Sequence, residues 1–231
     1  MSDLTLVLEG STYAGSVALL AGATIVAERT LVDTGIPSRA GREERVLPSV
    51  AECFAEAGVE IREIARVVCG AGPGSFTSLR VSASVAKGIA VGTGRPMYSV
   101  SSLILSVASA PQALPAGMYL SVLPAMREEF FVVLSDVSNS GAVTQIGEPF
   151  ITDHSGLADA AAHHEARLLG PEQQVGSRPH ARGVARLLAQ IVATGPVEID
   201  SWEPDYGRMA EAQVRWEAAH GRPLGALGAG A

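Results

Sequence analysis

The feature that most constrains the fold is a glycine-rich turn between an apolar run and a segment with helical spacing. Residues 67–70 are Val-Val-Cys-Gly, the turn occupies 71–75, and residues 77–91 contain no proline and repeat apolar side chains at helical spacing. This pattern predicts a buried strand that turns directly into a helix. Strands alternating with helices build α/β folds, so the turn argues against a β-sandwich or a helical bundle.

The residues around the turn predict the rest of one folding unit. Glycine-containing breaks separate three expected antiparallel strands, at residues 4–8, 16–20 and 24–31. Helical spacing closed by Gly58 predicts a helix over 43–57. A strand at 97–101 and a helix at 102–110 follow. This order predicts a mixed sheet covered by helices, the ribonuclease H-like unit.

The second half predicts a smaller and less regular unit of the same kind. Its expected elements are strands at 118–123, 129–135, 142–147 and 166–169, helices at 155–163, 180–192 and about 208–220, and a frayed tail at 221–231. We expect a linker near 110–116. The chain would then divide into an N-terminal lobe, residues 1–110, and a smaller C-terminal lobe, residues 111–231, that ends in the last helix and the tail.

The charge composition argues against a protein that binds nucleic acid by itself. The 231 residues include 17 basic and 24 acidic side chains, which gives a net charge of -7, and Lys87 is the single lysine. Neither half of the chain has a basic excess. Because neutralisation of phosphates supplies much of the affinity for nucleic acid, we expect this chain to hold a tRNA or DNA only with help from a partner.

Other global signals predict a cytoplasmic protein. The longest apolar runs have the length of a strand, far short of the roughly 20 residues that span a bilayer, and residues 1–5 show no export signal. Cys53 and Cys69 are isolated in apolar surroundings. This is more typical of buried thiols in a reducing compartment than of a disulfide or a metal site.

The glycine-rich turn is a weak candidate for an anion site. Gly72, Gly74 and Ser75 could expose backbone N–H groups at the start of a helix, an arrangement that suits an anion. The turn matches neither the Walker loop nor the GxGxxG pattern. A tight turn in which Ser75 or Thr77 caps the helix explains the same residues. The spacing alone leaves both interpretations open.

A second weak candidate is the break after the first strand. Glu9 and Ser11 stand where an actin-like or sugar-kinase fold would place an Asp-x-Gly-Thr phosphate hairpin. Glutamate in the place of aspartate argues against nucleotide hydrolysis, because metal geometry is sensitive to the reach of the carboxylate.

No catalytic residue and no metal ligand is predicted. The adjacent pair His163 and His164 lacks the i, i+4 spacing of a zinc helix, and no serine lies in a GxSxG sequence.

The helix at 77–91 has a face of small residues. Ser82, Ala86 and Ala90 lie at i, i+4 and i+8, with Ala83 beside them. Small side chains allow another element to approach closely. The face could pack within the chain or could receive the helix of a partner, and the pattern does not separate the two.

The turn and the helix together carry a family resemblance. Residues 72–81, Gly-Pro-Gly-Ser-Phe-Thr-Ser-Leu-Arg-Val, and residues 86–90, Ala-Lys-Gly-Ile-Ala, closely resemble the signature of the TsaB (YeaZ) family of bacterial tRNA threonylcarbamoyladenosine biosynthesis subunits. Weaker similarities continue in the same order, at residues 9–11, 47–48, 100–103, 125–131 and 204–212. The chain departs from the family pattern at Ser78, where glycine is usual, at Pro124, where aspartate is usual, and at 41–44, which lack a histidine.

The resemblance implies an actin/Hsp70/sugar-kinase-like (ASKHA) α/β fold of two ribonuclease H-like lobes with mixed sheets flanked by helices. It also implies a noncatalytic subunit that binds and activates a TsaD-like catalytic paralogue, the transferase that forms threonylcarbamoyladenosine at position 37 of tRNA. A TsaE-like ATPase would join the complex, and ATP or ADP and metal would bind to these partners. Alone, the chain would form a homodimer through the same surface. The residues expected at the partner interface are Val50, Phe54, Leu79, Ser82, Ala83, Ala86 and Ala90.

Two other functions share the fold or its history. An ATP-dependent kinase or hydrolase of the actin-like fold would bind Mg-ATP in a way that depends on Glu9. A peptidase is suggested only by an old glycoprotease label of the superfamily, and no triad or metal cluster in the sequence supports it.

Overall fold

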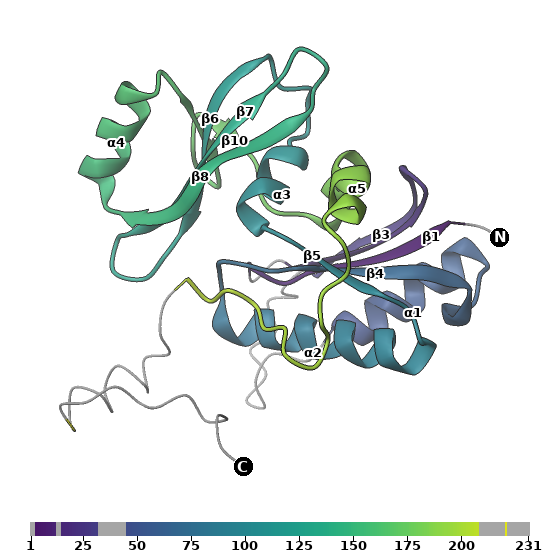
Figure 1. Ribbon diagram of the computed structural model, residues 1–231. Coiled ribbons are helices and arrows are strands. Elements are labelled where there is room, and N and C mark those ends of the chain that lie inside the picture. Colours follow the sequence, from purple (N-terminus) through teal and green to yellow (C-terminus); the bar gives the residue numbers. More distant parts are fainter. Residues whose placement is uncertain (1–2, 13–14, 32–44, 208–219, 221–231) are drawn as a thin grey trace.

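The computed structural model describes residues 3–12, 15–31, 45–207 and 220, and it contains two five-stranded sheets (Figure 1). The first sheet has the order β3-β2-β1-β4-β5. Its strands are β1 (Leu4–Glu9), β2 (Ser16–Ala21), β3 (Thr24–Thr30), β4 (Ile64–Gly70) and β5 (Met97–Val100). The first three strands are antiparallel, and β4 and β5 run parallel to β1. The predicted mixed sheet is therefore confirmed.

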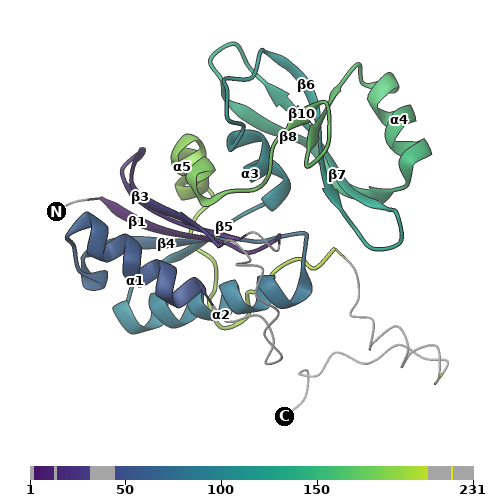
Figure 2. The same cartoon turned by 180° about the vertical axis from the view of Figure 1, so that it is seen from behind.

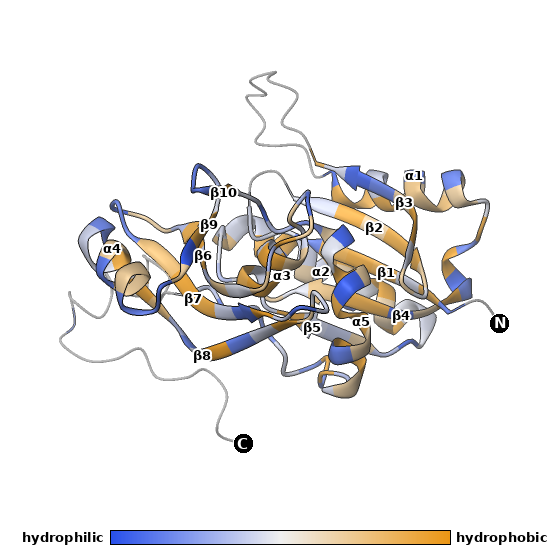
Figure 3. Cartoon of the chain, turned by 90° about the horizontal axis from the view of Figure 1, so that it is seen from above, coloured by the Kyte–Doolittle hydropathy of each residue, from blue (hydrophilic) through white to orange (hydrophobic). Residues whose placement is uncertain are grey.

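Helices cover both faces of the first sheet. α1 (Val46–Ala57) and α2 (Phe76–Thr93) lie on one face, and α3 (Ser102–Ala108) and α5 (Val184–Ala193) lie on the other (Figures 1 and 2). Every residue of β1 is buried because the strand is covered on both sides. Figure 3 shows apolar residues along β1 and β2 and hydrophilic residues on the edge strand β3.

Glycines end the two long helices, as the sequence predicts for Gly58. Gly58 after α1 and Gly94 after α2 have φ angles of 65° and 64°, the left-handed conformation of a helix C-cap. A short 3-10 turn, η1 (Ile61–Glu63), leads into β4. The predicted start of the first helix, at 43–44, lies outside the described residues.

The second sheet has the order β10-β9-β6-β7-β8. Its strands are β6 (Gly117–Pro124), β7 (Phe130–Val137), β8 (Val143–Thr152), β9 (Arg167–Gly170) and β10 (Val175–Gly176). α4 (His154–His163) covers its outer face, and α3 lies between the two sheets (Figure 1). All seven residues of α3 are buried, since both sides of the helix pack on a sheet.

The predictions for the second half need small corrections. The two-residue strand β10 was not predicted, because two residues give no periodicity. The segment predicted as a helix from residue 180 begins with a 3-10 turn, η2 (Ala181–Gly183). The predicted helix at 208–220 lies outside the described residues except for His220, and so does the tail at 221–231.

After α5 the chain returns to the first sheet. The Val197 N–H donates to the Met97 carbonyl at 2.8 Å, and the Asp205 N–H donates to the Ala71 carbonyl at 2.7 Å. We call residues 202–207 the C-terminal strap. The division of the chain at residue 110 stays a prediction, and α5 and the strap are later segments that pack on the first sheet.

Within the described part of the chain, no helix has the length and apolar character needed to cross a membrane.

Candidate functional site

The end of β1 and the glycine-rich turn lie side by side because β1 and β4 are parallel neighbours. Leu8 pairs with Cys69, which brings Glu9 next to Gly70. The Ser75 N–H then donates to the Ser11 carbonyl at 2.7 Å. The carboxyl ends of the strands of an α/β sheet are the usual place for a ligand. The residues that the sequence marked as weak anion candidates, Glu9, Ser11, Gly72, Gly74 and Ser75, are therefore brought together at one end of the sheet.

Glu9 is a fully buried carboxyl group that joins three segments of the chain. Its Oε1 accepts the Ser11 N–H at 2.6 Å, and its Oε2 accepts the Ser102 hydroxyl at 3.0 Å. Ser102 Oγ in turn accepts the Gly72 N–H at 3.1 Å. The β1–β2 hairpin, the glycine-rich turn and the start of α3 are thus held together by one carboxyl group. Ser102 had no role in the sequence analysis, because nothing local relates it to a residue 93 positions away.

The glycines of the site leave room for neighbouring backbone and carboxyl atoms. A Cβ atom at Gly70 would overlap Glu9 Oε2, and a Cβ atom at Gly74 would overlap the Ser11 carbonyl. At Gly72, whose φ is 88°, it would overlap the Asp205 carbonyl of the C-terminal strap. The space beside the turn is therefore filled by the chain's own atoms, and this argues against an anion there.

The helix that follows the turn has a serine at its N-cap position, but no side chain makes a capping hydrogen bond there. Ser75 is the N-cap residue of α2, but its hydroxyl makes no capping hydrogen bond and lies 3.0 Å from Ser78 Oγ. The predicted N-cap interpretation is therefore correct for the place of Ser75 and wrong for its hydrogen bond.

Burial sets the protonation of Glu9. Loss of solvent raises the pKa of its carboxyl above the ordinary value of 4.5, and hydrogen bonds from Ser11 and Ser102 oppose this effect in part. The folded state therefore binds a proton more tightly than the unfolded state. The stabilisation that the protonated Glu9 carboxyl gives to the folded state is therefore complete below pH 4.5. It is lost as the pH rises through the raised pKa.

We expect Glu9→Gln, which cannot titrate, to remove this part of the pH dependence. Between pH 4.5 and the raised pKa of Glu9, the wild-type free energy of unfolding should fall relative to that of the variant by up to about 1.4 kcal/mol per pH unit. Urea unfolding at a series of pH values from mildly acidic to alkaline measures the difference. The exposed Glu172→Gln variant is the control, and parallel profiles for the wild type and Glu9→Gln would contradict the assignment.

The seven residues predicted for the partner interface do not form a surface. Each is buried in the chain's own core: Val50, Phe54, Leu79, Ser82, Ala83, Ala86 and Ala90. The β1–β2 hairpin approaches α2 so closely that a Cβ atom at Gly10 would overlap Ser82 Oγ. The chain itself therefore requires small side chains on this side of α2. Their burial supports the alternative of packing within the chain, and the contact of these residues with a partner stays a prediction.

A different face of the same two helices is exposed. We call it the outer face and define it by six exposed residues that carry no charge: Leu47, Ala51 and Ala55 of α1 and Ser84, Gly88 and Val91 of α2. Leu47 is 53% exposed and Val91 is 65% exposed. A Cβ atom at Gly88 would have no neighbour within 4 Å. α1 and α2 lie together on one face of the first sheet (Figures 1 and 2), and they expose these small and apolar residues.

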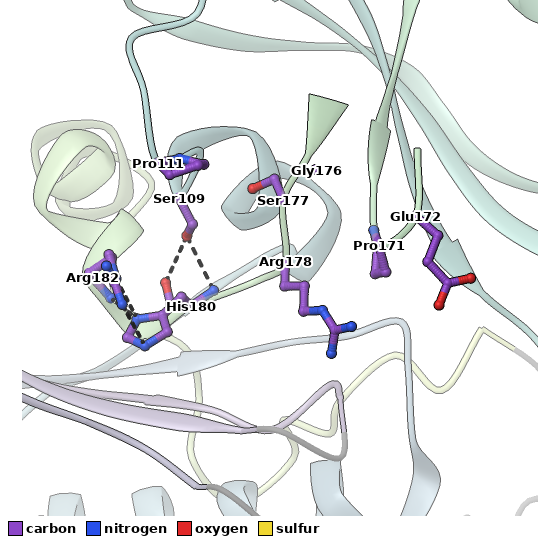
Figure 4. A pocket seen from close by; sticks show the side chains of 9 residues that line it. All are labelled: Ser109, Pro111, Pro171, Glu172, Gly176, Ser177, Arg178, His180 and Arg182. Carbon is purple, nitrogen blue, oxygen red and sulfur yellow. Dashed lines mark hydrogen bonds between the residues drawn. The ribbon is translucent and has the colours of Figure 1, made fainter. Parts of the chain in front are cut away.

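A groove of about 360 Å³ lies elsewhere, between the second sheet and the start of α5 (Figure 4). Ser109 Oγ donates to the His180 carbonyl at 2.9 Å and accepts the His180 N–H at 3.2 Å. Burial and the nearby Arg182 guanidinium lower the pKa of His180 to about 4, so the ring is neutral near pH 7. These contacts hold the start of α5, and the groove shares no residue with the Glu9 site.

Metal chemistry finds no support in the described part of the chain, where no group of three or more His, Cys, Asp or Glu side chains could hold an ion.

Comparisons with known proteins point to one family. The family model for TsaD, tRNA N6-adenosine threonylcarbamoyltransferase, matches residues 24–152. The tRNA threonylcarbamoyladenosine biosynthesis protein TsaB of Haemophilus influenzae is 32% identical over 151 residues, which cover 65% of this chain and 61% of that protein. The match to TsaB of Escherichia coli, also 32% identical, spans 38% of each chain. The chain thus spans less than two thirds of these two relatives.

More distant relatives align over most of their length. TsaB of Bacillus subtilis is 23% identical over 91% of this chain and 96% of its own. The solved structure of YeaZ from Pseudomonas aeruginosa superposes with a TM-score of 0.69 and 26% identity, covering 89% of this chain and 100% of that one. The two-lobe arrangement is therefore shared with a structure of known fold.

Proposed function

Because the chain belongs to the TsaB (YeaZ) family, within the wider group described by the threonylcarbamoyltransferase model, we propose that it is a noncatalytic partner subunit in the synthesis of threonylcarbamoyladenosine at position 37 of tRNA. Its role would be to bind and activate a TsaD-like catalytic paralogue. The fold is the actin/Hsp70/sugar-kinase-like α/β fold that the sequence predicts.

One observation carries the noncatalytic part of the proposal. The place where an actin-like fold would receive phosphate groups is occupied by the Glu9 carboxyl, the Ser11 carbonyl and the Asp205 carbonyl. A nucleotide phosphate there would have to displace the buried, hydrogen-bonded Glu9 carboxyl and Ser11 carbonyl, and a buried polar group left without a partner costs about 1–3 kcal/mol. This supports a chain that binds its partner rather than its own nucleotide, with ATP or ADP and metal on the partner subunits.

The outer face supports the partner-binding part. Small and apolar side chains allow two helices to approach closely, and uncharged residues are typical of the centre of an interface. We assign this face to the helices of the catalytic paralogue and, in its absence, to a second copy of the chain. A TsaE-like ATPase would join the assembled pair. The net charge of -7 supports binding of tRNA through the complex only.

The thiols support a cytoplasmic location for this complex. Cys53 and Cys69 are both free and buried, and burial raises the pKa of Cys53 to about 11 and also raises the pKa of Cys69. Such thiols are inert and are common in proteins of reducing compartments.

Reconstitution tests the proposal. A mixture of the TsaD-like paralogue, the TsaE-like ATPase, the threonylcarbamoyl donor system and tRNA should form the modified nucleoside only when this chain is added, while the chain alone should form none. Full modification without the chain would overturn the proposal.

Calorimetric titration with Mg-ATP tests the kinase or hydrolase alternative. We expect no micromolar binding to the isolated chain. Binding and turnover that Glu9→Ala abolishes would favour the alternative.

A further inference from the structure

Arg80 is an exposed cation that the chain holds in one position. Its guanidinium lies 4.3 Å from the centre of the Phe76 ring, and its Nε donates to the Tyr206 hydroxyl at 3.3 Å. The rings of Phe76 and Tyr206 are 4.6 Å apart, so the α2 residue and the strap residue support the same side chain. No carboxylate within the described residues forms an ion pair with Arg80. Within the part of the chain that the structure describes, this charge is thus fixed in place and has no paired carboxylate.

This arrangement lowers the cost of using Arg80 in binding. A free arginine side chain loses up to about 2 kcal/mol of rotamer entropy when it is ordered. Stacking on an aromatic ring orders the guanidinium in advance and leaves N–H groups at its edge for a further acceptor. Preorganised groups of this kind bind more tightly because the ordering cost is already met in the free protein.

Arg80 also lies at one end of the outer face. Arg80, Ser84 and Gly88 are at i, i+4 and i+8, so they follow one another along the exposed side of α2. The six residues that define the outer face carry no charge, and the charged side chains beside them are Lys87 of α2 and Glu52 and Glu56 of α1. A charge at the rim of a helix interface sets partner choice and orientation.

We infer that Arg80 binds a carboxylate on the helix of the catalytic paralogue and selects that partner. The inference rests on the proposed function and adds the chemistry of the contact. Phe76 and Tyr206 act as positioning residues. A carboxylate is favoured over an RNA phosphate because Glu203 and Asp205, both exposed, closely precede Tyr206 on the strap. A polyanionic backbone would face these two carboxylates, whereas one acidic side chain on a helix can avoid them.

The test measures binding of the full chain to the TsaD-like paralogue at low and at moderate salt. Arg80→Gln should weaken binding about tenfold and should reduce the salt dependence of the association rate. Arg80→Lys, which keeps the charge but not the planar donors, should retain the salt dependence and lose a few-fold in affinity. Tyr206→Ala should slow association with Arg80 still present, and Tyr206→Phe should have a smaller effect because the ring remains.

Arg186→Gln is the matched control, since Arg186 is an exposed arginine of α5 on the opposite face of the first sheet. It should bind as the wild type does, and thermal unfolding should confirm that all variants are folded. Wild-type affinity and salt dependence in Arg80→Gln would overturn the inference alone. Failure of the wild type to bind the paralogue would overturn the proposed function and the inference with it. Unchanged protein affinity with weaker tRNA retention in Arg80→Gln would assign the contact to phosphate and also overturn it.

Discussion

Gly88→Arg is expected to leave the chain folded and to abolish its association, both with the catalytic paralogue and with a second copy of itself. Gly88 is exposed, and a Cβ atom added there would meet no neighbouring atom within 4 Å in the single chain. In the complex, however, a long charged group would stand where a partner helix must come close, which costs several kcal/mol. We expect a loss of at least about 100-fold in affinity, measured by light scattering after size exclusion and by titration with the paralogue.

Ala86→Arg is the informative comparison because it changes the same helix two residues earlier. Ala86 is 0% exposed and packs in the core beneath the first sheet. Burial of an unpaired charge should destabilise the fold by about 3–5 kcal/mol, so the variant should unfold at a lower temperature or fail to fold. A folded Ala86→Arg that no longer associates, together with a Gly88→Arg that associates normally, would show that the outer face is the wrong surface.

The elements of the fold could be predicted because their signals are local. The apolar run at 4–8 became β1 (Leu4–Glu9), and the helix predicted over 77–91 became α2 (Phe76–Thr93), each within two residues. Gly58 ends α1 in the left-handed conformation that glycine adopts without strain. Each of these decisions depends on residues that are close together in the sequence.

The orientation of α2 could not be predicted, because the helix carries two rows of small residues. Ser82, Ala86 and Ala90 form one row at four-residue spacing, and Ser84, Gly88 and Gly92 form another. Either row could face the sheet on the criterion of size. The contact of the first row with Gly10 decides the matter, and that contact exists only once the hairpin is placed over the helix.

The Glu9 site was half predictable for a related reason. The weak anion candidates did gather in one place, since parallel strands end at the same edge of a sheet. Whether these residues contact a ligand or the chain itself depends on Ser102 and on the Asp205 carbonyl, which come from distant segments of the chain. Local patterns mark residues that are able to bind, and long-range packing decides whether the chain itself uses that capacity.

The second large effect concerns Gly70. Gly70→Ala should destabilise the chain by about 3 kcal/mol or more, because the added Cβ would overlap the Oε2 atom of the buried, hydrogen-bonded Glu9 carboxyl. Glu9→Ala should cost about 2–4 kcal/mol, since it leaves the Ser11 N–H and the Ser102 hydroxyl without their acceptor and opens a cavity. Urea unfolding of both variants gives these values.

The double variant Glu9→Ala/Gly70→Ala separates a specific fit from general intolerance of the strand. With the carboxyl removed, the new methyl group enters the space that it left, so the double variant should be more stable than the sum of the single changes by about 2 kcal/mol. Gly92→Ala, at an exposed helix position with no neighbour within 4 Å, is the control and should be neutral or stabilising by about 0.5–1 kcal/mol. Strict additivity would mean that Gly70 is required by the backbone alone. A positive coupling would instead show that Gly70 is required because its missing side chain leaves space for the buried Glu9 carboxyl group.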